Sequence, residues 1–165
     1  MSRLIFLQGL PGSGKSTKAR ELLNEYGNAV RLNRDLLRTM LHGDAVWSGK
    51  QERITKDVAR TVAKHLLTDG KIGVLIIDDT NLHASTVESW RSLAQECEAK
   101  FEIVRMDTPI DECLRRDALR EKPVGRHVIL GMAMQYGFKP PPAKGYVICD
   151  IDGTLADIRH RLHYV

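Results

Sequence analysis

The sequence contains few cysteines and no long apolar run. Its three cysteines, Cys97, Cys113 and Cys149, lie far apart and lack the paired spacing of a disulfide framework or a zinc site. No stretch of about 18 apolar residues could span a bilayer. The apolar residues 4–7 are also too few for a signal-peptide core of about 7 to 15 residues. We therefore expect a cytoplasmic protein without a membrane partner.

The charge balance is mildly basic. The 165 residues carry 25 Lys and Arg against 21 Asp and Glu, which gives a net charge of +4. A chain of this length suits one domain, since typical domains contain about 100 to 200 residues. The positive excess favours a polyanionic partner. It becomes informative where arginines cluster, between Arg115 and Arg126.

Short apolar runs alternate with segments of helical spacing. The predicted strands cover residues 4–8, 29–32, 72–77 and 101–106. The predicted helices cover residues 15–26, 34–41, 51–68, 89–97 and 109–120, and a less regular segment continues to residue 133. This alternation predicts an α/β fold, a doubly wound parallel sheet with helices on both faces.

The helix predicted at residues 51–68 carries an apolar stripe. Ile54, Val58, Val62 and Leu66 recur at every fourth position, and Asp69-Gly70 can end the helix. We expect this stripe to be the packing face.

Residues 9–16, which we call the phosphate loop, match the pattern G-x-x-x-x-G-K-[S/T] between a predicted strand and a predicted helix. In this context backbone N–H groups and the helix N-terminus bind phosphates, so the fold is of the P-loop NTPase type. Lys15 should reach the β- and γ-phosphates of ATP, and Ser16 should place its hydroxyl on Mg²⁺, with Thr17 a poorer candidate. The expected nucleotide-binding residues are Gly9, Pro11, Gly12, Ser13, Gly14, Lys15, Ser16 and Thr17.

The acceptor side of the reaction is expected after the second strand. Asp35 and Arg38 lie one helical turn apart and share a face. A carboxylate there could accept the proton of an attacking hydroxyl, and an arginine could clamp a phosphate on the acceptor. The alternative is structural, because Asn33 or Asp35 could simply cap the helix.

Two further sites carry charges suited to phosphoryl transfer. Asp78 and Asp79 end a buried strand, where a carboxylate commonly holds magnesium or its waters, although either could be a capping residue. Arg116 and Arg120 are spaced i, i+4 and could form a helical lid over the phosphates. A solvated basic helix face is the alternative, and the register stays open among Arg115, Arg116, Arg120 and Arg126.

Together these motifs resemble the phage-type polynucleotide kinase/phosphatase family, and they occur in the family's order over nearly the whole chain. The motifs are the phosphate loop, Asn33-Arg34-Asp35 with Arg38, Asp79-Thr80-Asn81-Leu82, the Arg116/Arg120 pair and Asp150-Ile151-Asp152-Gly153-Thr154.

The resemblance implies an end-healing and repair kinase that moves the γ-phosphate of ATP to the 5′-hydroxyl of DNA or RNA. Asp35 would be the general base and Arg38 would grip the 3′-side phosphate of the acceptor. Lys15 and Ser16 would serve ATP and magnesium, Asp79 the metal and the acceptor, and Thr80 the acceptor. Arg116 and Arg120 would complete the catalytic set.

The resemblance also divides the chain. It implies a kinase domain at residues 1–138, a proline-rich linker at 139–145, and the first strand and loop of an incomplete haloacid-dehalogenase-type phosphatase domain at 146–165. Asp150 and Asp152 match the nucleophile loop of such phosphatases, but only 15 positions follow Asp150, so we expect no phosphatase activity. We take His160, His163 and Trp47 as tail or packing residues rather than as metal ligands or a base-stacking platform.

The sequence leaves two alternative functions open. Asp35-Leu36-Leu37-Arg38 also resembles a stretch of adenylate kinases, which would imply a kinase of a nucleoside monophosphate or a small hydroxyl metabolite. The second alternative is a non-catalytic ATP-binding module that regulates a partner.

Overall fold

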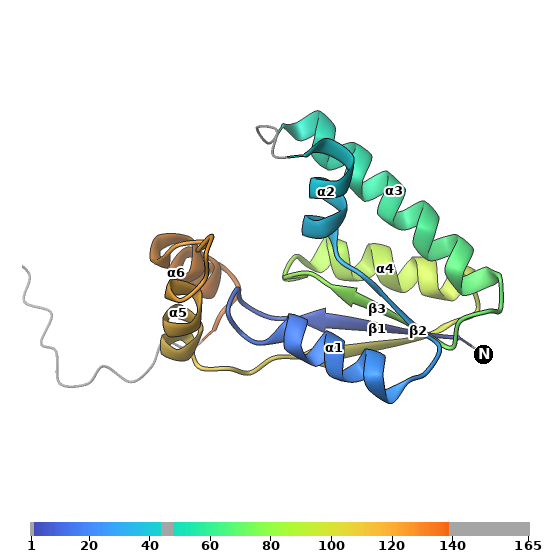
Figure 1. Cartoon of the computed structure of the whole chain (residues 1–165), viewed down its shortest axis with the longest axis horizontal. Helices are drawn as coiled ribbons and strands as arrows, with labels where there is room; N and C mark the ends of the chain where they lie inside the picture. The colour runs from blue at the N-terminus through green and yellow to red at the C-terminus, as the bar shows by residue number, and fades with distance from the viewer. Residues whose placement is uncertain (1, 44–47, 139–165) are drawn as a thin grey trace, which may run out of the picture.

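The computed structural model describes residues 2–43 and 48–138 (Figure 1). The expected linker and phosphatase segment, together with Trp47, His160 and His163, lie outside the described residues. Within the described part of the chain, no helix is both long and apolar enough to cross a membrane.

The described residues form a four-stranded sheet of order β2-β3-β1-β4 in which every pair is parallel. The strands are β1 (Arg3–Gln8), β2 (Ala29–Leu32), β3 (Val74–Asp78) and β4 (Lys100–Arg105). The central strands β1 and β3 are the most buried, since both of their faces are covered by helices. Their near-continuous apolar sequences follow from this double burial.

The described residues also form six helices. They are α1 (Lys15–Glu25), α2 (Arg34–His42), α3 (Gly49–Thr68), α4 (Ala84–Glu96), α5 (Ile110–Ala118) and α6 (Arg126–Gln135). The connection from β1 to β2 runs toward one edge and that from β3 to β4 toward the other, so right-handed crossovers put α1 and α4 on opposite faces. Figure 1 shows this arrangement, with α3 beside α4. The predicted doubly wound α/β fold is confirmed.

The phosphate loop and Asp79 lie where the connections of two neighbouring strands diverge. β1 continues into α1 on one face, and β3 continues into α4 on the other, which leaves a crevice at the carboxyl ends of the strands. The phosphate loop follows β1 there, and Asp79 follows β3. At this end α5 and α6, which we call the lid, pack on Leu10 of the loop through Ile110, Cys113 and Ile129 (Figure 1).

The predicted packing stripe of α3 is wrong by one position. Ile54 and Val62 are 40% and 38% exposed, and the buried positions are Thr55, Ala59, Ala63 and Leu67. One residue corresponds to a rotation of about 100° on a helix. The helix packs through its small side chains because Ala59 and Ala63 let its backbone come close to the neighbouring core. Ala63 belongs to the same core cluster as Leu93 and Ala94 of α4.

The segment before residue 133, expected to be irregular, contains the helix α6. The buried carboxylate of Asp117 accepts hydrogen bonds from the backbone N–H groups of Val124 (3.2 Å) and Gly125 (2.9 Å). These contacts hold Gly125, the residue that precedes α6, in position. Sequence periodicity does not indicate this anchor, because Asp117 contacts the loop that follows its own helix.

Candidate active site

The phosphate loop is closely packed against the lid. Gly12 and Gly14 have positive φ values of 79° and 94°, a conformation that residues with a side chain rarely adopt. A Cβ on Gly12 would lie 2.3 Å from the carbonyl oxygen of Cys113 in α5. Thr108 adds a hydrogen bond of 2.8 Å from its hydroxyl to the carbonyl of Ser13. The glycines therefore shape the loop and also allow α5 to dock on it.

Lys15 lies inside the phosphate loop. Its ammonium donates to the carbonyl oxygens of Gly9 (3.0 Å) and Leu10 (2.7 Å), and the residue is only 8% exposed. Burial lowers the pKa of Lys15 to about 8, and the nearby Asp78 carboxylate opposes this shift. An anionic ligand such as a phosphate group would favour the charged form of this lysine.

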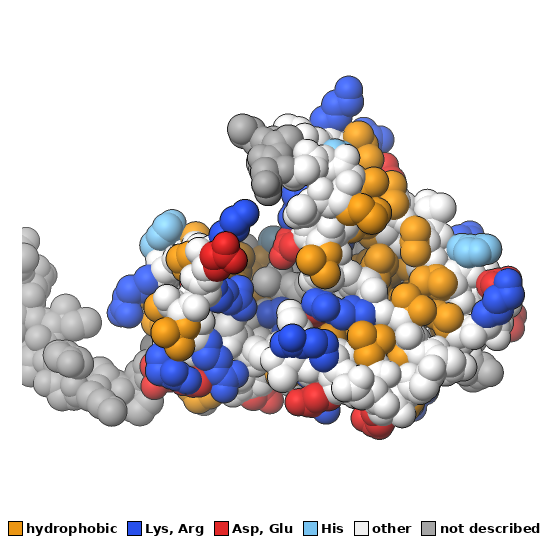
Figure 2. Space-filling model, viewed as in Figure 1, with side chains coloured by type: hydrophobic (Ala, Val, Ile, Leu, Met, Phe, Trp, Pro, Cys, Tyr) orange, Lys and Arg blue, Asp and Glu red, His pale blue; other side chains and the backbone are white. Residues whose placement is uncertain are grey.

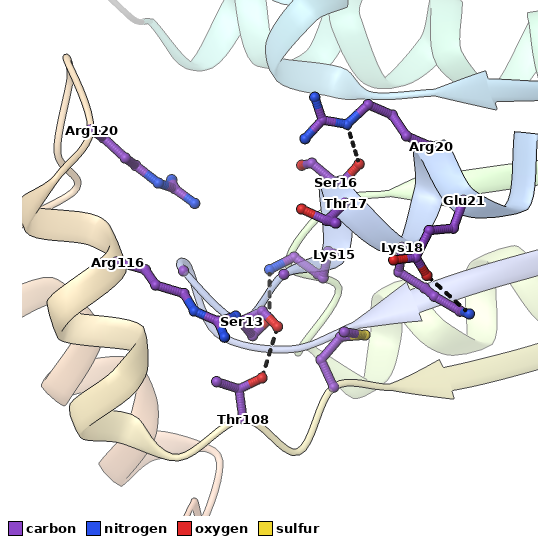
Figure 3. Close-up of a pocket in the computed structure, with 13 residues that line it drawn as sticks. Ser13, Lys15, Ser16, Thr17, Lys18, Arg20, Glu21, Thr108, Arg116 and Arg120 are labelled. Atoms are coloured by element: carbon purple, nitrogen blue, oxygen red, sulfur yellow. Dashed lines mark hydrogen bonds and ion pairs between the residues drawn. The ribbon is translucent and has the colours of Figure 1, made fainter.

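A cavity of about 610 Å³ opens between the phosphate loop, α1 and the lid (Figure 3). A volume in this range accommodates a nucleotide-sized ligand. Its charged lining is mostly cationic: Lys15, Lys18, Arg20, Arg116, Arg120 and one acid, Glu21, which pairs with Lys18 at 3.3 Å. Figure 2 shows Lys and Arg side chains around the hollow between the lid and α2. The cavity suits a polyphosphate.

The lid contributes two arginines to this cavity. Nη1 of Arg116 would lie 3.4 Å from a Cβ on Gly14, so this guanidinium lies over the loop. Its Nε donates to Glu112 at 2.6 Å. Figure 3 shows Arg120 extending from the lid side of the cavity toward α1, and its charge lowers the pKa of Lys15. The other two candidates, Arg115 and Arg126, are not among the residues that line the cavity.

At the start of α2 one residue caps the helix and another leaves its carboxylate exposed. Asn33 accepts a hydrogen bond of 2.9 Å from the N–H of Leu36 and donates to the carbonyl of Asp78, so Asn33 is the cap. The side chain of Asp35 is 82% exposed and accepts a 2.6 Å hydrogen bond from Nη1 of Arg38. Of the two capping alternatives, the structure selects Asn33 and leaves the carboxylate of Asp35 accessible.

Glu52, on α3, holds the arginines of α2 and was missed by sequence reasoning. It accepts from Nη2 of Arg38 at 2.7 Å and lies 3.4 Å from Nη1 of Arg34, with its own side chain 15% exposed. Arg34 pairs in turn with Asp79 at 2.7 Å. Burial raises the pKa of Asp79, and the charge of Asp35 adds to this shift. One ionic network therefore links Asp79 to Asp35.

The two aspartates at the end of β3 pair with different arginines. Asp78 is 1% exposed and accepts two hydrogen bonds from Arg31, at 2.6 and 2.9 Å. It acts on Lys15 more strongly than Asp79 does. Asp79 instead faces α2, where Arg34 contacts both of its oxygens. Asp78 is thus the carboxylate more closely coupled to the phosphate loop.

The site offers oxygen ligands that fit Mg²⁺. The described residues contain no group of three or more His, Cys, Asp or Glu side chains arranged for a metal. Mg²⁺ usually keeps several waters and takes one or two protein ligands besides substrate phosphates. Ser16 lines the cavity, and Asp78 lies near Lys15. A hydroxyl and a carboxylate of this kind are suitable donors.

Thr80 and Asn81 connect the two central strands at the site. The carbonyl of Thr80 accepts from the N–H of Gly9 at 3.1 Å. Asn81, in the left-handed region with φ 54°, donates from Nδ2 to the carbonyl of Leu7 at 2.8 Å. These contacts fix the start of the phosphate loop relative to Asp79. The predicted role of Thr80 in acceptor binding stays a prediction, since the contact shown is made by its backbone.

The family described as "AAA domain" matches residues 4–141. The chain belongs to this family. Among curated proteins it is 29% identical to L-seryl-tRNA(Sec) kinase of Methanococcus maripaludis over 98% of the chain and 61% of that protein. It is 28% identical to the putative bifunctional polynucleotide kinase/RNA ligase of Autographa californica nuclear polyhedrosis virus over 98% of the chain but 26% of that protein.

A solved structure of the Pnkp1/Rnl/Hen1 RNA repair complex contains a similar chain. It superposes with a TM-score of 0.65 at 26% identity and covers 90% of this chain and 51% of the other. The chain thus spans about a quarter to three fifths of the length of these relatives. The family match, the phosphate loop and the parallel sheet together show a P-loop NTPase fold.

Proposed function

We propose that this chain transfers the γ-phosphate of ATP to the 5′-hydroxyl ends of DNA or RNA. The observation that carries the proposal is the exposed carboxylate of Asp35, which Arg38 contacts at 2.6 Å and which shares an ionic network with Asp79 beside the phosphate loop. The carboxylate of a capping aspartate would accept hydrogen bonds from backbone N–H groups, but Asn33 already caps this helix.

The reaction divides between two sides of the crevice. On the nucleotide side, Lys15, Arg116 and Arg120 neutralise the charge that develops on the transferred phosphoryl group. On the acceptor side, the 5′-oxygen attacks the γ-phosphorus, its proton passes to Asp35, and the bond to the β–γ bridging oxygen breaks to release ADP. Arg38 orients Asp35 and grips the 3′-side phosphate of the acceptor.

Mg²⁺, when bound, supplies charge neutralisation at the β- and γ-phosphates. Ser16 would hold it, with Asp78 or Asp79 on its waters. We favour Asp78, because Arg34 contacts both oxygens of Asp79, whereas both hydrogen bonds from Arg31 fall on Oδ2 of Asp78 and not on its Oδ1.

The similarities to a putative polynucleotide kinase/RNA ligase and to a chain of an RNA repair complex support a nucleic-acid acceptor. The similarity to L-seryl-tRNA(Sec) kinase, which covers 98% of this chain and 61% of that protein, supports a second candidate, a hydroxyl carried on a charged tRNA. In both candidates Asp35 would deprotonate an alcohol.

An acceptor assay tests the proposal. Labelled ATP and Mg²⁺ are offered with a 5′-hydroxyl DNA oligonucleotide, the matching RNA, seryl-tRNA, AMP, or no acceptor. We expect label on the oligonucleotide ends. Transfer to AMP or to seryl-tRNA, without transfer to either oligonucleotide, would contradict the proposal, and nucleotide binding with no transfer to any acceptor would favour a regulatory module.

A further inference from the structure

A second cationic cavity lies between α3 and α4, outside the nucleotide site. Its volume is about 230 Å³. Three cations and three hydroxyl side chains account for most of its lining: Arg34, Lys56, Arg60, Ser85, Thr86 and Ser89. No acidic residue lines it in the described part of the chain. Cations with hydroxyl donors and no carboxylate form a site for an anion.

The positive charge of this cavity is only partly compensated. Nη1 of Arg60 donates to the backbone carbonyl (2.9 Å) and the hydroxyl (2.6 Å) of Ser89, which are both neutral. Lys56 is 58% exposed and lies 3.8 Å from Glu52, a weak ion pair that Glu52 shares with two arginines. The first turn of α4, which supplies Ser85 and Thr86, contains no acid. An incoming anion would therefore meet a net positive lining.

The cavity is continuous with the acceptor side of the proposed site. Arg34 lines it and also pairs with Asp79 and Glu52, and Glu52 holds Arg38. Arg34 and Arg38 are four residues apart on α2, a rise of about 6 Å at 1.5 Å per residue. A strand whose first phosphate binds Arg38 could therefore present a following phosphate to Arg34, Lys56 and Arg60.

We infer that this cavity binds a backbone phosphate of the acceptor strand, downstream of the phosphate gripped by Arg38. The inference rests on the proposed function and extends it. It makes the acceptor a polynucleotide, because a nucleoside 3′-monophosphate has no second phosphate to occupy the cavity. Specificity for a chain would then come from α3 and α4, whereas the chemistry comes from the phosphate loop, α2 and the lid.

The test compares two acceptors and two double variants. Lys56→Ala/Arg60→Ala removes two charges from the cavity. Lys71→Ala/Lys100→Ala removes two exposed charges near the amino ends of β3 and β4, at the end of the sheet away from the phosphate loop, and serves as the matched control. The acceptors are a nucleoside 3′-monophosphate and a 5′-hydroxyl hexanucleotide. We expect the cavity variant to raise KM for the hexanucleotide about tenfold, with kcat and the monophosphate KM unchanged.

A binding measurement gives a second readout that does not require activity. The anisotropy of a 3′-labelled, 5′-hydroxyl hexanucleotide is followed against salt, and the slope of log K against log salt should become shallower by about 0.7 in the cavity variant, as expected for one lost phosphate contact. The Arg60→Ala change also removes a hydrogen bond to α4, so its effect could come from altered packing. Lys56→Ala alone must therefore raise KM and make the salt slope shallower, as the double variant does.

Equal effects on both acceptors, or an effect no larger than in the control, would overturn the inference. No transfer by the unaltered chain to either acceptor would refute the proposed function instead. In that case the anisotropy slopes still decide whether the cavity contacts a phosphate.

Discussion

Nucleotide binding should be coupled to proton uptake by Lys15. Burial lowers the pKa of this lysine to about 8 in the free protein, where its ammonium is surrounded by carbonyl oxygens of the phosphate loop. The phosphates of ATP carry several negative charges and would favour the protonated form. The pKa is therefore depressed before binding and raised after it, so binding takes up a proton at alkaline pH.

The magnitude follows from the pKa. With a pKa of about 8 for free Lys15 and a fully protonated lysine in the complex, uptake should be about 0.1 proton per nucleotide at pH 7, about 0.5 at pH 8 and about 0.9 at pH 9. The apparent affinity should fall about tenfold from pH 7 to pH 9, since the protonated fraction falls by that factor. Above pH 8 the slope of log Kd against pH approaches one.

Isothermal titration calorimetry of Mg-ATP in pairs of buffers with different ionisation enthalpies measures this uptake directly. Lys15→Arg is the control, because an arginine stays protonated at every pH used and should show no uptake even if its affinity is lower. Uptake that stays near zero at pH 9 in the unaltered chain would refute the argument. Lys15 would then be fully charged in the free loop, and its burial would not govern its pKa.

Three substitutions test other parts of the site. Asp35→Asn should reduce transfer by about 10² to 10⁴ without weakening ATP binding, as expected for loss of a general base; near-normal turnover would refute that role. Glu52→Gln should reduce kcat/KM on the order of tenfold by releasing Arg38, whereas Glu98→Gln, on the surface, should not. Gly12→Ala should lower Tm and ATP affinity together, because its Cβ meets Cys113; an unchanged Tm would contradict the packing argument.

Features that depend on local sequence were predicted more accurately than features that depend on contacts between residues far apart in the chain. Most strand and helix positions were close to those found, because they depend on local apolar patterns, and β2 was predicted at the residues it occupies. The exception is α4, which begins five residues before the predicted start at residue 89. The buried face of α3 was predicted wrongly, since bulky residues at Ile54 and Val62 suggested a core that small residues form instead. The helix α6 was missed, because Asp117 positions its start through a loop.

The sequence alone determined the local arrangement of the phosphate loop. Gly12, Gly14, Lys15 and Ser16 act within one loop and one helical turn, so their spacing along the chain fixes their relation in space. It also placed Asp35 and Arg38 on one face of a helix, where a 2.6 Å hydrogen bond joins them.

Only the tertiary structure decided how that pair is held and what lies beyond it. Glu52 is 14 residues from Arg38, and Arg34 is 45 residues from Asp79, so these contacts depend on how α2, α3 and β3 pack. The cavity between α3 and α4 likewise brings together side chains from three helices. Spacing along a chain specifies contacts within an element, whereas the packing of buried surfaces decides which elements share a site.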